Sequence, residues 1–112
     1  MATSRSTSDS GWIAGALVFS GRPDPIWPIP PGVAEELVAI WESLSSTDAT
    51  VTPPALGYRG CYVRDPDGRM WTAYHELVTL SSEWRRDDDR RFEHTVLASA
   101  PAGMLPPSAA AG

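Results

Sequence analysis

The strongest structural signal in this sequence is the tetrapeptide DPDG at residues 65–68, which lies between two runs that contain Tyr, Val, Trp and Thr. Pro66 fixes φ near the value that the second position of a type I turn requires. Gly68 tolerates the positive φ of the residue that closes such a turn. Residues 56–80 are therefore predicted to form an antiparallel β-hairpin.

The turn also determines which residues of the hairpin share a face. One face holds the predicted cross-strand pairs Val63–Trp71, Cys61–Ala73 and Arg59–His75. It is the more apolar face, so we assign it to the core. The other face, called the tyrosine face below, holds Tyr58, Tyr62 and Tyr74 beside Arg64 and Glu76. Aromatic residues with polar neighbours are typical of protein interfaces, but a helix could equally cover this face.

Two segments before the hairpin have clear periodicity. Residues 12–20 are apolar on both sides of a predicted strand, which is typical of a strand that is central in a sheet or covered on both faces. Residues 32–44 are predicted to form a helix with Pro31 at its start, which Ser45 and Ser46 end. The apolar stripe of this helix consists of Val33, Leu37, Ile40, Trp41 and Leu44.

A second helix is predicted near the end of the chain. Asp87 or Asp88 can cap its first turn, and Pro101 lies where it is expected to stop. Its apolar positions are Phe92, Val96, Leu97 and Ala100. The order strand–helix–strand–strand–helix predicts an α+β domain in which two helices pack on a small antiparallel sheet of three or more strands.

The composition limits the domain organisation and the function classes. We expect residues 1–10 to be a disordered leader, 11–100 a single domain and 101–112 a flexible tail rich in Pro, Ala and Gly. The net charge of −5 over 112 residues argues against nucleic-acid binding, which needs a basic face. No apolar run approaches the ~20 residues of a membrane span.

The location expected from the sequence is the cytoplasm. The single cysteine, Cys61, cannot form an intrachain disulfide, so a disulfide scaffold is excluded. Arg5 before the short apolar run at residues 12–19 leaves a signal peptide open as an alternative.

The proline stretch, SGRPDPIWPIPP at residues 20–31, has two interpretations. Arg22, Pro25 and Pro28 match an R-x-x-P-x-x-P spacing, which modules with aromatic grooves bind. Under that interpretation Trp27 is an exposed anchor for a partner. The interpretation that we favour is a rigid connection between strand and helix, with Trp27 packed on the sheet.

The segments FSGRPDPIW and LGYRGCYV resemble stretches of small bacterial proteins of an SGRPxPxW type. The resemblance spans about residues 17–100. It implies an intact bacterial domain and brings no fold, activity or cofactor with it.

The open end of the hairpin is a candidate ligand pocket, because Arg59, His75 and Tyr74 are expected there. Cys61 and His75 could in principle form a nucleophile and its base. Their predicted pairing is diagonal, so we favour a buried structural cysteine.

The sequence predicts no metal and no cofactor. His75, Glu76 and His94 match no compact ligand motif, and no phosphate-binding glycine loop is present. We therefore expect a non-catalytic accessory or protein-interaction domain, such as a small subunit of a larger complex, that binds a protein partner or a second copy. The alternative left open is a small-ligand binder or minor enzyme with a pocket near Arg59, His75 and Tyr74.

Overall fold

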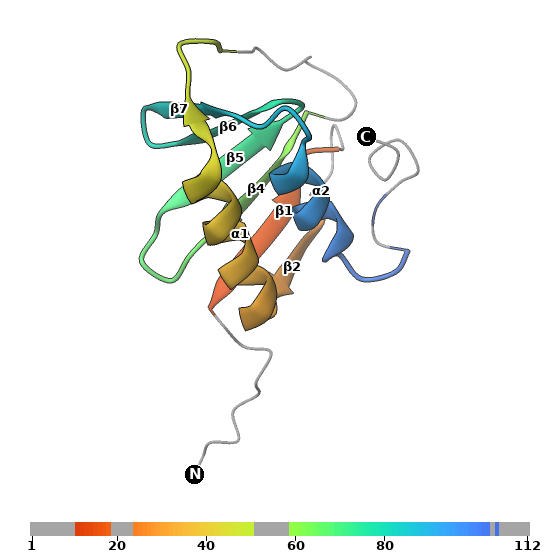
Figure 1. Ribbon diagram of the computed structural model, residues 1–112. Coiled ribbons are helices and arrows are strands. Elements are labelled where there is room, and N and C mark those ends of the chain that lie inside the picture. Colours follow the sequence, from red (N-terminus) through yellow and green to blue (C-terminus); the bar gives the residue numbers. More distant parts are fainter. Residues whose placement is uncertain (1–10, 19–23, 51–58, 104, 106–112) are drawn as a thin grey trace.

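The computed structural model describes residues 11–18, 24–50, 59–103 and 105, which form an α+β domain (Figure 1). Its strands are β1 (Trp12–Ala16), β2 (Ile26–Ile29), β3 (Ser45–Ser46), β4 (Cys61–Arg64), β5 (Met70–Tyr74), β6 (Leu77–Leu80) and β7 (Glu83–Arg86). They make one antiparallel sheet in the order β2-β1-β4-β5-β6-β7-β3. The helices α1 (Pro31–Ser43) and α2 (Arg91–Ala98) both lie in front of the sheet in Figure 1. The predicted fold class is confirmed.

The predicted hairpin is formed by β4 and β5. Its register pairs Cys61 with Ala73 and Val63 with Trp71, as the turn chemistry predicts. In the turn, the amide of Gly68 donates to the carbonyl oxygen of Asp65 at 3.0 Å, and Gly68 has φ of 93°. The observed register is therefore the one that the local turn sequence predicts.

The hairpin ends earlier than the sequence suggested, so the predicted pairing of Arg59 with His75 is wrong. β5 stops at Tyr74, and His75 takes a φ of 57°. His75 and Glu76 form a two-residue turn, because Tyr74 pairs with Leu77 of the returning strand β6.

The proline stretch contributes the edge strand β2. β2 pairs with β1 in a register that places Ala14 opposite Trp27 and Ile13 opposite Pro28. A central strand would exclude Pro28, because proline cannot donate a ladder hydrogen bond, but an edge strand tolerates it. β1 itself ends at Ala16, before the predicted end at residue 20.

Helix α1 forms where its apolar stripe predicts. Pro31 occupies the first turn, where a missing amide hydrogen costs no helical hydrogen bond. The buried positions are Ala34, Leu37, Ile40 and Trp41, with Val33 and Leu44 packed at the edge of the core.

Helix α2 is capped by Asp87, one of the two candidates that the sequence offers. Its carboxylate oxygens accept hydrogen bonds from the backbone amides of Arg91 at 3.0 Å and Phe92 at 2.7 Å. Asp87 lies three positions before Arg90, which is the N-cap residue and has φ of 56°. The capping side chain therefore comes from before the N-cap residue, and the left-handed backbone of Arg90 lies between Asp87 and the helix.

Both helices and one face of the sheet share a single core. It includes Ala14, Trp27, Val63 and Trp71 from the sheet together with Leu37 and Phe92 from the helices. Trp27 is only 2% exposed. The interpretation in which Trp27 is an exposed anchor therefore does not describe this fold, and the packed interpretation does.

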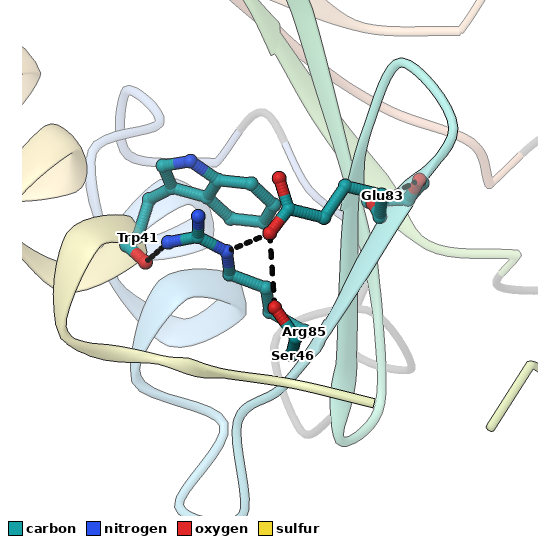
Figure 2. A network of polar contacts seen from close by, with 5 residues as sticks. Trp41, Ser46, Glu83 and Arg85 are labelled. Atoms are coloured by element: carbon teal, nitrogen blue, oxygen red, sulfur yellow. Dashed lines mark hydrogen bonds and ion pairs between the residues drawn. The ribbon is translucent and has the colours of Figure 1, made fainter. Parts of the chain in front are cut away.

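The end of α1 is held against the sheet by a polar network (Figure 2). The Arg85 guanidinium lies 4.2 Å from the centre of the Trp41 ring and donates to the Trp41 carbonyl at 2.8 Å. Glu83 accepts hydrogen bonds from Arg85 at 2.7 Å and from Ser46 at 3.1 Å. These two hydrogen bonds, chiefly the one from Arg85, hold the pKa of Glu83 below its ordinary value of 4.5.

Candidate functional site

The candidate site is the sheet face opposite the helices, called the outer face below. Alternate residues of each strand point to opposite faces, and the core residues settle which face is which. The outer face consists of Ile13, Gly15, Ile26, Pro28, Tyr62, Arg64, Met70, Thr72, Tyr74, Leu77, Thr79, Trp84 and Arg86. It contains Tyr62 and Tyr74 of the tyrosine face, so neither helix covers those residues.

Large apolar side chains are exposed on the outer face. Ile26 is 57% exposed and Met70 is 48% exposed. The middle row of the face, read across six paired strands, is uncharged: Ile26, Gly15, Tyr62, Thr72, Thr79 and Trp84. An uncharged row with exposed apolar side chains beside it is the feature that makes this face a candidate contact surface.

The Tyr62 ring lies over its cross-strand neighbour Gly15, which has no side chain. A β-carbon on Gly15 would lie 2.5 Å from the Tyr62 ring. The ring therefore occupies the space above Gly15, as aromatic side chains do beside glycines in sheets. The aromatic ring of Tyr62 is therefore part of the outer face.

The charge of the outer face is opposite to that of the chain. Among its described strand residues, only Arg64 and Arg86 are charged, whereas the whole chain carries a net charge of −5. Arg64 lies in the row next to Ile13 and Met70, and Arg86 lies at the other end of the strands beside Leu77. The two guanidinium groups thus flank the uncharged row.

The other residues predicted for the partner surface differ in their exposure. Pro28 is exposed and Pro25 is half-buried. Arg22 and Tyr58 lie outside the described residues.

A pocket of about 250 Å³ opens at the end of the outer face where β5 turns into β6. Its lining residues are Ala49, Thr50, Tyr74, His75, Glu76, Leu77 and Arg86. The rings of Tyr74 and His75 are 4.2 Å apart and tilted by 35°. The pocket lining therefore combines apolar side-chain surface with one basic group, Arg86, and one acidic group, Glu76.

Two of the three residues predicted for a ligand pocket come together here, and the third does not. Tyr74 and His75 line the pocket, but Arg59 is not among its described lining residues. Arg59 Nη2 instead lies 3.7 Å from Asp24 Oδ2, next to the chain that enters β2. The sequence missed Arg86, because the strand that carries it was not expected.

Cys61 is not placed as a nucleophile for this pocket. It is fully buried on the face that the helices cover, where its Sγ lies 4.0 Å from the carbonyl oxygen of Glu93. His75 lies in the turn that lines the pocket. Within the described ranges, no group of three or more His, Cys, Asp or Glu residues is arranged to hold a metal ion.

Comparisons of the chain with protein-family models, with curated proteins and with solved structures find no match. In the part of the chain that the structure describes, no helix is long and apolar enough to cross a membrane.

Proposed function

We propose that this protein is a non-catalytic interaction domain, such as a small subunit of a larger complex, that binds an acidic partner protein through its outer face. The observation that carries the proposal is the exposure of Ile26 and Met70 on a sheet face that neither helix covers. A few residues, most often Trp, Tyr and Arg, supply most of the binding energy in protein interfaces. The outer face also carries Tyr62, Tyr74 and Arg64.

The charges on the outer face favour an acidic partner over a second copy. An interface between two copies of this face would bring Arg64 and Arg86 of both chains together, with no carboxylate from the described strand residues of the face. An acidic surface would instead neutralise both arginines. Glu35 and Glu36, which are both exposed, lie on α1 on the opposite side of the sheet.

Binding by addition of a strand to β2 is a weaker alternative. Ala16 donates to the carbonyl of Pro25 at 3.2 Å, so the antiparallel alternation directs the backbone groups of Ile26 and Pro28 toward the free edge. Pro28 has no amide hydrogen to offer there, and edge prolines protect sheets against pairing. The face of the sheet is therefore a better contact surface than its edge.

The proposal keeps the bacterial origin and the cytoplasmic location expected from the sequence. Cys61 is a buried thiol that forms no disulfide within the chain, which is compatible with a reducing compartment.

Site-specific photo-crosslinking in the producing cell tests the proposal. A photoreactive amino acid replaces Met70 on the outer face or, as a control, Ala39, which is exposed on α1. We expect one heterologous adduct of defined mass from position 70 and none from position 39. A dimer-sized adduct, equal adducts from both positions or no adduct from position 70 would overturn the proposal.

Charge reversal tests the chemistry of the partner. Arg64→Glu should abolish the adduct from position 70, because it places a carboxylate against an acidic surface. Arg91→Glu makes the same change in net charge on the helix side, where Arg91 donates to Ser43, and should leave the adduct unchanged. An adduct that survives Arg64→Glu would show that the partner is not held by charge.

A further inference from the structure

We propose that the pocket at the β5–β6 turn binds a small zwitterion that carries an apolar group, of which a free aromatic α-amino acid is the simplest example. The proposal concerns a small molecule at one end of the outer face. It does not depend on the protein partner proposed above.

The pocket is built on a row of paired residues. Tyr74 of β5 is directly opposite Leu77 of β6, which is directly opposite Arg86 of β7. Directly opposed residues have β-carbons about 4.5–5.5 Å apart, so the row spans three rigid strands. An aromatic group, an aliphatic group and a guanidinium therefore line one short stretch of the pocket.

Arg86 is suited to bind the carboxylate of such a ligand. Its guanidinium lies 3.7 Å from Asp88 Oδ1, and these side chains are 46% and 72% exposed. An exposed ion pair of this length contributes little and exchanges readily. A ligand carboxylate can instead accept two parallel hydrogen bonds from the guanidinium, which is the stronger arrangement.

Glu76 adds a negatively charged carboxylate to the pocket lining that contains Arg86. Its carbonyl oxygen accepts a hydrogen bond from the Asp87 amide at 2.7 Å, which fixes the turn that carries it. Among the described residues, its carboxylate makes neither a hydrogen bond nor an ion pair. A purely anionic ligand would meet this carboxylate unfavourably, whereas an ammonium group would be attracted to it.

The size and the walls of the pocket match one amino acid. Its volume of about 250 Å³ lies below the 300–1,000 Å³ or so that is typical of pockets for drug-sized ligands. The Tyr74 and His75 rings and Leu77 supply surface for an apolar side chain. The two-residue turn between β5 and β6 holds His75 at a φ of 57°.

Three probes that differ in one charge test the proposal: L-phenylalanine, 3-phenylpropionate, which lacks the ammonium, and phenethylamine, which lacks the carboxylate. Each is titrated into the ¹⁵N-labelled full chain and followed by amide shifts. We expect phenylalanine to bind about threefold to fivefold more tightly than either probe, which is the contribution of one exposed ion pair. Shifts should centre on residues 49–50, 74–77 and 86.

Two variants assign the charges. Arg86→Gln should remove the preference for phenylalanine over phenethylamine, and Glu76→Gln should remove the preference over 3-phenylpropionate. Arg64→Gln, on the outer face but outside the pocket lining, should change neither preference. The ¹⁵N spectrum of each free variant shows whether it is folded, and Arg86→Lys, which keeps the charge, replaces Arg86→Gln if that variant is not. Equal binding of the three probes, shifts centred elsewhere or preferences that survive both substitutions would overturn the proposal.

Discussion

The indole Nε1 of Trp27 donates a hydrogen bond to the Oγ of Ser99 at 2.8 Å, which joins the edge strand β2 to the end of helix α2. The Ser99 hydroxyl donates in turn to the carbonyl of Val96 at 2.6 Å. The tryptophan of the proline stretch is therefore both a core residue and a polar link between two layers. It stabilises the fold instead of presenting a surface.

Substitution of Trp27 should consequently reduce stability strongly. Trp27→Ala removes a side chain that is 2% exposed, and we expect it to lower the free energy of unfolding by about 3–5 kcal/mol. Ser99→Ala keeps the ring but leaves its N–H unpaired, which should cost about 1–3 kcal/mol. Urea unfolding measures both. A Trp27→Ala variant with an unchanged midpoint would contradict the packed position of the ring.

The cap of α2 gives a second prediction. Asp87→Ala removes the acceptor of the Arg91 and Phe92 amides and should lower the free energy of unfolding by about 1–2 kcal/mol. The neighbouring Asp88 is exposed, so Asp88→Ala should stay within about 0.5 kcal/mol of the wild type. Equal losses in the two variants, measured by urea unfolding, would show that the cap is not the cause.

Asp65 in the hairpin turn should make stability depend on pH. Burial acts to raise its pKa, but hydrogen bonds from the side chain and the backbone of Arg69 outweigh burial, so the pKa lies below the ordinary value of 3.8. The unfolded chain then binds the proton more tightly than the folded chain. This contribution to stability is present above about pH 4 and is lost as pH falls through the folded pKa.

The prediction is tested with Asp65→Asn. The free energy of unfolding of the wild type should fall more steeply between pH 5 and pH 2.5 than that of the variant, and the two curves should converge at the acid end. Glu83→Gln is a companion measurement, because Glu83 also has a lowered pKa and should show the same sign. Parallel curves for the wild type and Asp65→Asn would contradict the role of the Arg69 hydrogen bonds.

The parts of the fold that could be predicted are those in which local chemistry decides the structure. The DPDG turn determines the register of β4 on β5, so the placement of Tyr62 and Tyr74 on one face followed from the sequence. The apolar stripe and Pro31 determined α1, and Asp87 marked the start of α2.

The rest could not be predicted because its turns and strands lack the usual signals. His75 and Ser81 take φ of 57° in two-residue turns that contain no glycine, so the segment after Tyr74 did not suggest further hairpins. Arg86 of the pocket was missed for that reason. Arg59 would line the pocket only in a β4–β5 hairpin that continued past Tyr74, where β5 ends.

Two glycines of the sheet should differ in their tolerance of a methyl group. Gly60 has a φ of 108°, and a β-carbon there would lie 2.7 Å from the backbone oxygen of Ala73. Neither the strain nor the contact can be relieved by moving a side chain, so Gly60→Ala should cost at least about 2 kcal/mol of unfolding free energy.

Gly15→Ala meets only the end of the Tyr62 side chain, which can rotate away, so we expect a loss of about 1 kcal/mol or less. If the Tyr62 ring is the obstacle, Gly15→Ala should become neutral or stabilising in a Tyr62→Ala background, because alanine restricts the unfolded chain more than glycine does. No second substitution of a side chain should rescue Gly60→Ala, because its obstacle is backbone. A double-mutant cycle on Gly15 and Tyr62 measures the coupling. Additive losses would mean that the ring does not lie across Gly15, and the aromatic surface of the outer face would then have to be placed elsewhere.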